Sequence, residues 1–170
     1  MDNTLIITCG GTFSKTYNPL SGEMIVPTNN QILDSLLEKF FKQNKDIVEV
    51  QSFIFKDSLD MDEKDRKNLK ELIEKTKHSK IIIIHGTDTI DLSAKYIEET
   101  AISKNICIVF VGAMEPISIC ATEGAMNLGC AYGFLQGSKE KGVFISMNGL
   151  VKRVTEIKKN HTLGYFECQK

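Results

Sequence analysis

The chain has 170 residues, of which 42% are hydrophobic and 25% charged, and its formal net charge is −1. These values are typical of one globular domain with a substantial core, and they lack the basic excess that nucleic-acid binding requires. The five cysteines form no C-x-x-C pair, and the first apolar run after Met1 is too short for a signal or membrane segment. We therefore expect a cytoplasmic protein with reduced thiols and no membrane contact.

The first half of the chain alternates between predicted strands and helices. A β-rich run over Thr4–Thr8 comes first, and a helix with apolar residues at helical spacing follows a Thr28-x-x-Gln31 capping box. Ile47–Phe55 alternates in polarity as a strand does, and a second amphipathic helix is predicted to open at Asp60. This order is that of a strand–helix–strand–helix unit.

The second half continues the alternation with more strongly apolar strands. Lys80–Ile84 and Ile106–Val111 are continuous apolar runs, typical of strands buried on both faces of a parallel sheet. Asp88–Lys104 and Cys120–Leu135 are predicted helices, and Val143–Met147 is a fifth strand. The pattern predicts right-handed βαβ units in one α/β domain over residues 1–170. Its fold is a doubly wound, mostly parallel sheet with helices on both faces, a three-layer arrangement of the Rossmann or flavodoxin kind.

Polar residues come directly after the predicted strands, at the sheet edge where open α/β folds bind ligands. They are Thr12 after the first strand, Asp57 and Ser58 after the second, and Thr87 and Asp88 after the third. Gly11 and Gly86 let the backbone approach a ligand closely. Because a threonine hydroxyl needs a neighbouring base or polarising group to act as a nucleophile, two threonines and an acid at one rim indicate a nucleophilic hydrolase.

Five motifs in this order resemble those of the N-terminal domain of the bacterial L-asparaginase/glutaminase family. They are Cys9–Thr12, Asp57–Met61, His85–Thr89, Val111–Pro116 and Glu123–Leu128. The second threonine motif, H-G-T-D-T, is intact, and the similarity runs on to Lys159. The resemblance thus covers essentially the whole chain and is far more specific than a single glycine-rich turn.

The resemblance implies an amidohydrolase that converts a side-chain carboxamide to an acid and ammonia without a metal or other cofactor. Its catalytic residues would be Thr12 as the acyl-forming nucleophile, Tyr17 on a mobile lid, and the group Thr87, Asp88 and Lys159, with Lys158 as the alternative lysine. Its substrate-binding residues would be Gly11, Ser58, Leu59, Gly86 and Ala113. Ser58 would bind the α-carboxylate of the substrate, and the Ala113 backbone its side-chain amide.

The chain also departs from the family pattern. Cys9 replaces the first threonine of T-G-G-T, and Leu59 stands where many members carry a polar substrate-binding residue. Family members continue into a second, smaller domain, whereas this sequence ends at Lys170, as expected of either a single-domain member or a fragment. Three functions therefore stay open: an amidohydrolase, a non-catalytic amino-acid sensor, and an asparaginase-like subunit of an amidotransferase-type assembly. Because family members self-associate, a homodimer that acts on a small amide is predicted.

Each candidate residue also has a purely structural interpretation. Thr12 and Thr87 taken singly are ordinary helix caps, and Asp88 complements a helix N-terminus. Lys159 lies in a lysine-rich run of the kind that usually forms a solvated face, and Tyr17 fits an exposed loop equally well. His85 at a strand end is predicted to be a buried, hydrogen-bonded structural residue rather than a general base. No spacing among the three histidines suggests a metal site.

Overall fold

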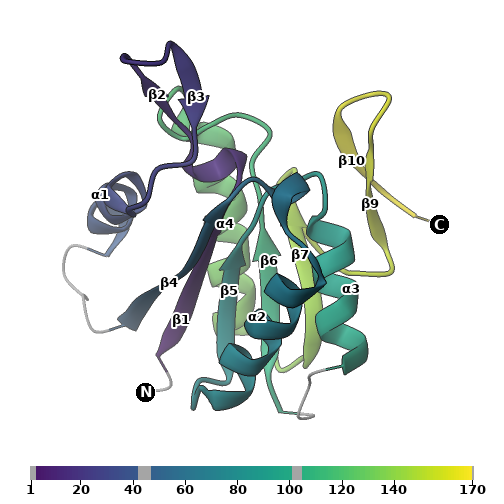
Figure 1. Ribbon diagram of the computed structural model, residues 1–170. Coiled ribbons are helices and arrows are strands. Elements are labelled where there is room, and N and C mark those ends of the chain that lie inside the picture. Colours follow the sequence, from purple (N-terminus) through teal and green to yellow (C-terminus); the bar gives the residue numbers. More distant parts are fainter. Residues whose placement is uncertain (1–2, 42–46, 101–104, 170) are drawn as a thin grey trace.

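The computed structural model describes residues 3–41, 47–100 and 105–169 and is built around a six-stranded sheet with the order β4–β1–β5–β6–β7–β8 (Figure 1). The strands are β1 (Thr4–Gly10), β4 (Val48–Lys56), β5 (Lys80–Ile84), β6 (Cys107–Val111), β7 (Gly142–Met147) and β8 (Leu150–Arg153). All neighbouring pairs are parallel except β7–β8, which is antiparallel. The sheet is therefore mostly parallel, as predicted.

Apolar strands at the centre of the sheet set its register. All four isoleucines of β5 are fully buried, because β1 and β6 flank the strand and helices cover both of its faces. β1 pairs with β5 without interruption from Thr4 opposite Lys80 to Thr8 opposite Ile84. The carboxyl ends of these two strands consequently lie side by side.

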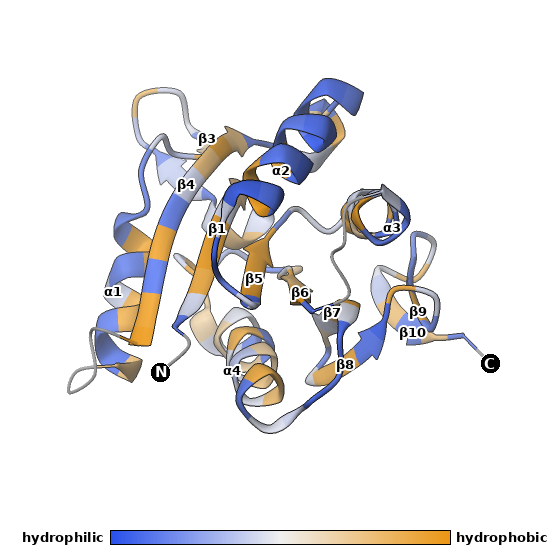
Figure 2. Ribbon diagram, turned by 90° about the horizontal axis from the view of Figure 1, so that it is seen from below, coloured by the Kyte–Doolittle hydropathy of each residue, from blue (hydrophilic) through white to orange (hydrophobic). Residues whose placement is uncertain are grey.

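Within the described ranges, four helices cover the two faces and complete three layers. They are α1 (Gln31–Phe40), α2 (Glu63–Lys75), α3 (Ile90–Thr100) and α4 (Ala121–Gly137). One apolar cluster joins α2 and α3 to one face of the sheet, and a second joins α1 and α4 to the other face. Figure 2 shows the two helix pairs on opposite sides of the sheet, with apolar residues turned inward. The predicted α/β class is confirmed.

The expectation of uniformly right-handed crossovers is wrong at α4. The connections through α2, α3 and α4 all step in the same direction across the sheet, yet α4 packs on the opposite face from the other two. The connection through α1 runs in the opposite direction across the sheet and lies on the same face as α4. Because both the direction and the face are reversed, it has the same hand as the connections through α2 and α3. Since almost all such units are right-handed, the β6–α4–β7 unit is left-handed. A long connection, residues 112–120, separates β6 from α4.

Three predicted helix starts are also wrong. The N-cap of α1 is Asn30 rather than Thr28, and its side chain bonds to Thr8 and Ser52 across the sheet edge instead of capping the helix. The N-cap of α2 is Asp62, which forms a capping box with Asp65. Helix α3 starts at Ile90, two residues after the predicted Asp88, and the predicted end at residues 101–104 lies outside the described residues.

Two hairpins that the sequence did not predict rise at the carboxyl edge of the sheet (Figure 1). One joins β2 (Thr16–Asn18) to β3 (Glu23–Ile25), and the other joins β9 (Ile157–Asn160) to β10 (Tyr165–Cys168). They belong to opposite ends of the chain and flank the loops that follow β1 and β5. None of the described helices combines the length and apolar character that a membrane span needs.

Candidate active site

The site lies where the strand order of the sheet reverses direction. Numbered along the chain, the five parallel strands have the order 2-1-3-4-5, so the chain first moves outward from β1 to β4 and then returns across β1 to β5. The connections after β1 and β5 therefore lead to opposite faces of the sheet. Open α/β folds bind ligands at such a point, and we call the region between these two loops the crevice. Thr12 follows β1, and Thr87 follows β5.

Two glycines bring the backbones of these loops into contact. A Cβ atom placed on Gly11 would lie 2.3 Å from the Cα and 2.4 Å from the nitrogen of Gly86. The φ of Gly11 is +77° with ψ near −175°, a conformation that is open almost only to glycine. The loops that carry Thr12 and Thr87 thus touch at the residue that precedes each threonine.

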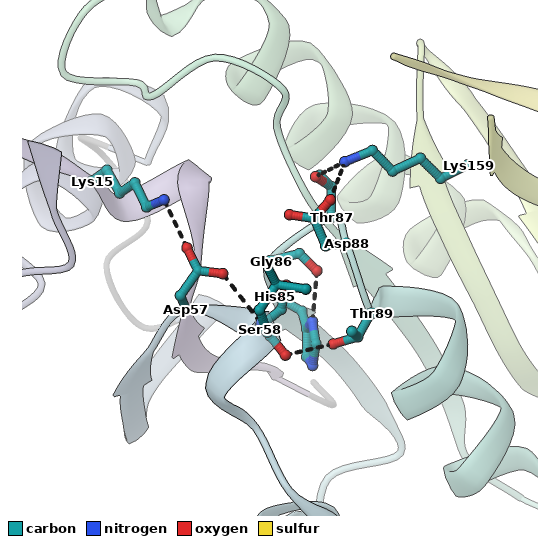
Figure 3. Close-up of polar contacts among 10 residues, drawn as sticks. Lys15, Asp57, Ser58, His85, Gly86, Thr87, Asp88, Thr89 and Lys159 are labelled. Atoms are coloured by element: carbon teal, nitrogen blue, oxygen red, sulfur yellow. Dashed lines mark hydrogen bonds and ion pairs between the residues drawn. The ribbon is translucent and has the colours of Figure 1, made fainter. Parts of the chain in front are cut away.

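Thr87, Asp88 and Lys159 form a directly hydrogen-bonded group. The Nζ of Lys159 donates to Oγ1 of Thr87 at 2.8 Å and to Oδ1 of Asp88 at 2.7 Å (Figure 3). Because an ammonium group has only donors, Thr87 Oγ1 accepts in this contact and keeps its own hydrogen for another partner. The arrangement polarises the hydroxyl of Thr87.

The alternation of β9 decides between the two candidate lysines. Ile157 and Lys159 are buried, whereas Lys158 between them is exposed. Only 8% of Lys159 is accessible, so its ammonium group exchanges most of its hydration for Thr87 and Asp88. Lys159 is therefore the lysine that reaches the loop after β5.

Ser58 lies at the third side of the crevice, in the short 3-10 helix η3 (Ser58–Asp60) after β4. It is 1% exposed, and its Oγ has no hydrogen-bond partner among the described residues. A Cβ on Gly86 would lie 2.6 Å from this Oγ, so the hydroxyl is packed against the glycine of the β5 loop. Its neighbour Leu59 is 71% exposed and contributes an apolar side chain to the rim.

The loop after β6 adds Ala113, which is fully buried. A Cβ on the preceding Gly112 would lie 2.8 Å from Cγ2 of Thr87, so this loop packs against the second threonine. Glu123 of α4 accepts hydrogen bonds from the backbone nitrogens of Met114 and Glu115 and holds the loop in place. This role of Glu123 was not predicted. The sequence feature that could have indicated it is an acidic residue in the first turn of a helix.

Thr12 and Tyr17 are less closely joined than the other candidates. Thr12 begins the 3-10 helix η1 (Thr12–Ser14), is half-buried, and its hydroxyl makes no hydrogen bond among the described residues. Tyr17 lies on the β2–β3 hairpin, is 62% exposed, and likewise makes no side-chain hydrogen bond in the described part of the chain. The structure thus leaves the Thr12 hydroxyl free but does not bond Tyr17 to it.

His85 is buried and hydrogen-bonded, as predicted. Its Nδ1 lies 2.8 Å from the carbonyl oxygen of Gly86, which can only accept, so Nδ1 carries the proton. Desolvation lowers the pKa of His85 to about 4, although the bond to Gly86 opposes this shift. The ring is therefore neutral and fixes the peptide that joins Gly86 to Thr87.

This burial predicts a specific dependence of stability on pH. The unfolded chain binds a proton on His85 near pH 6.5 and the folded chain only near pH 4, so the free energy of unfolding should fall as the pH drops through this window. The loss at pH 5 should be about 2 kcal/mol. Urea titrations between pH 7.5 and 4 measure it.

His85→Asn is the informative variant, because its amide nitrogen can replace Nδ1 in the bond to Gly86. We expect it to flatten the slope between pH 6.5 and 4. Desolvation would raise the pKa values of Asp57 and Asp65, but hydrogen bonds from lysines and backbone N–H groups outweigh it and lower them. These two carboxylates therefore lose their contribution to the free energy of unfolding only at lower pH. An unchanged slope in the variant would refute the assignment.

Comparison with known proteins identifies the family to which the chain belongs. The family model for the N-terminal domain of asparaginase matches residues 3–167. A glutaminase-asparaginase from Acinetobacter glutaminasificans is 27% identical over 95 residues, which are 55% of this chain and 28% of that protein.

Two solved structures share the fold. The thermostable L-asparaginase from Thermococcus kodakarensis superposes with a TM-score of 0.84 at 20% identity over 98% of this chain and 51% of its own. A probable cytoplasmic L-asparaginase from Campylobacter jejuni gives 0.79 at 23% identity over 99% and 53%. The chain therefore spans about half the length of these solved relatives. It belongs to the asparaginase family and corresponds to the family's N-terminal domain.

Proposed function

We propose that this chain hydrolyses the side-chain carboxamide of a small amino acid such as asparagine through a threonine ester. The observation that carries the proposal is the hydrogen-bonded group of Lys159, Thr87 and Asp88, which lies where the strand order reverses. The loop that holds Thr87 and Asp88 also touches Gly11, the glycine next to Thr12. Such a site holds one free hydroxyl and one polarised hydroxyl. Family membership and the names of the relatives support an amide substrate.

The proposed reaction has two halves. Oγ1 of Thr12 attacks the carboxamide carbon, its proton passes to the leaving nitrogen, and ammonia departs to leave an acyl ester on Thr12. Water then attacks the ester, which releases the acid and restores the hydroxyl. Thr87, held by Lys159 and Asp88, would relay protons in both halves, as a positioned acid–base group does.

Release of ammonia from asparagine and glutamine by the purified chain tests this function. The matched control is Thr12→Ala, which removes only the proposed nucleophile. Release above that control supports the hydrolase, and release equal to it from every amide tested excludes hydrolysis of those amides. In that case, binding of asparagine in a calorimeter without turnover would favour a sensor, and a stable co-purifying partner would favour an amidotransferase-type assembly.

Ser58→Ala separates a ligand-binding hydroxyl from a structural one. An unpartnered buried hydroxyl contributes no stability, so the variant should unfold with an unchanged or slightly larger free energy. If Ser58 binds the substrate carboxylate, KM should rise about tenfold or more, since hydrogen bonds to charged groups are worth about 1.5–3 kcal/mol. Steady-state kinetics and urea unfolding measure the two effects. Lower stability with an unchanged KM would contradict the binding role.

The proposed assembly is a homodimer. Family membership supports it, and light scattering on the purified chain tests it directly. A monomer at the concentrations used for the assay would contradict it.

A further inference from the structure

A second ion pair lies at the crevice, apart from the Lys159 group. Nζ of Lys15 lies 2.7 Å from Oδ2 of Asp57, and the two side chains are 25% and 27% exposed (Figure 3). Lys15 directly follows η1, which begins with Thr12, and Asp57 directly precedes Ser58. The pair therefore connects the segment of the proposed nucleophile to the segment of the proposed carboxylate anchor.

Lys15 is held at its backbone as well as at its ammonium group. Its N–H donates to the carbonyl oxygen of Thr12 at 3.1 Å, and its carbonyl oxygen accepts from Oγ of Ser118 at 2.6 Å. The next residue begins the β2–β3 hairpin, which carries Tyr17. Lys15 is thus the junction at which the hairpin joins the body of the protein.

Asp57 uses its two carboxylate oxygens for different partners. Oδ1 accepts from the backbone nitrogen of Leu59 at 3.2 Å and caps η3, while Oδ2 accepts from Lys15. Burial would raise the pKa of Asp57, but Lys15 and the backbone N–H groups of Leu59 and Ser58 lower it below its usual value. The carboxylate therefore stays charged and fixes the Ser58 turn and the base of the hairpin together.

We propose that Lys15 and Asp57 are positioning residues that latch the β2–β3 hairpin onto the Ser58 turn and so keep the crevice in its binding arrangement. This role rests on the proposed function of the crevice. Neither side chain needs to touch the reacting atoms. When the ion pair is lost, the binding-competent arrangement of the crevice is less populated. The apparent affinity for the substrate then falls in proportion to the population of that arrangement. Saturating substrate restores the arrangement, so KM should rise while kcat stays the same.

The chain offers clean variants for the test. Asp57→Asn keeps an acceptor for Leu59 and removes only the charge, Lys15→Met removes the other charge, and Lys15→Arg keeps it. We expect the first two to raise KM by up to about fivefold, the upper limit for losing an ion pair of this exposure, with kcat unchanged. The double variant should be no worse than either single one, because both changes remove the same interaction. Lys15→Arg should restore most of the affinity.

Hydrogen exchange of residues 16–25 provides a readout that needs no turnover. Exchange should accelerate in Lys15→Met and Asp57→Asn but not in Lys70→Met, which breaks a comparable ion pair with Glu74 on α2. Unchanged exchange in both site variants overturns the latch, and so does a loss of kcat, which would indicate direct contact with the reaction. If no amide is turned over at all, the proposed function fails while the exchange experiment still decides the latch.

Discussion

Lys159→Met should lower kcat for amide hydrolysis by about 100- to 10,000-fold, the usual contribution of positioned acid–base groups. The ammonium group is the donor that polarises Thr87 and anchors Asp88 beside it. Methionine has a similar length but no donor, so it leaves the Thr87 hydroxyl without its polarising partner. Because Thr87 would act on the transition state rather than on bound substrate, KM should change much less than kcat.

The same variant should lose less unfolding free energy than the roughly 3–5 kcal/mol that breaking a fully buried ion pair costs. Burying the lysine is itself costly, and methionine removes that cost while filling the space. The Asp88 side chain is 35% exposed, so water can replace the lost partner. A large loss of activity with a small loss of stability would identify Lys159 as functional rather than structural.

Lys158→Met is the matched control, since it removes the same charge from the adjacent, outward-facing position of β9. Its kinetics and stability should equal those of the parent chain. Lys159→Arg should not rescue activity, because a planar guanidinium does not fit a site built around a compact ammonium group. Parental kcat in Lys159→Met would exclude the proposed role of the Thr87 group.

The sequence predicted the sheet well because its central strands are extreme in composition. A run such as Lys80–Ile84 is stable only when both faces are covered, so its place in the fold follows from local residues alone. The handedness of the α4 connection could not be predicted in this way. It depends on which face the helix finally covers, which is decided by packing among distant segments.

Part of the site could likewise be predicted from the local sequence, and part of it could not. Glycine followed by threonine after a strand places a hydroxyl at the sheet edge, and Thr12, Ser58 and Thr87 all lie there. The burial of Lys159 is not a local property: its strand is short and lysine-rich, and only Thr87 and Asp88 make an inward ammonium group tolerable. The Lys15–Asp57 pair was missed because Lys15 lies in no motif and the two residues are distant in sequence.

Gly11→Ala should cost at least about 3 kcal/mol of unfolding free energy and abolish amide hydrolysis. The new Cβ would lie 2.3 Å from the Gly86 Cα, a backbone atom that cannot rotate away. The φ of +77° adds strain of about 1–3 kcal/mol for any residue with a side chain. The two loops must therefore separate, which moves Thr12 away from the Thr87 group. A fall in melting temperature of about 6–12 °C is the expected signature.

Gly22→Ala distinguishes the clash from the backbone strain. Gly22 lies in the turn of the β2–β3 hairpin with a φ of +71°, but no atom lies within 4 Å of an added Cβ. It should lose only about 1–2 kcal/mol. Calorimetry and ammonia release on both variants separate the two causes, because only the clash acts at the contact between the loops. Equal losses in the two variants would mean that the Gly11–Gly86 contact does not hold the threonines together, and the proposed two-threonine chemistry would lose its structural basis.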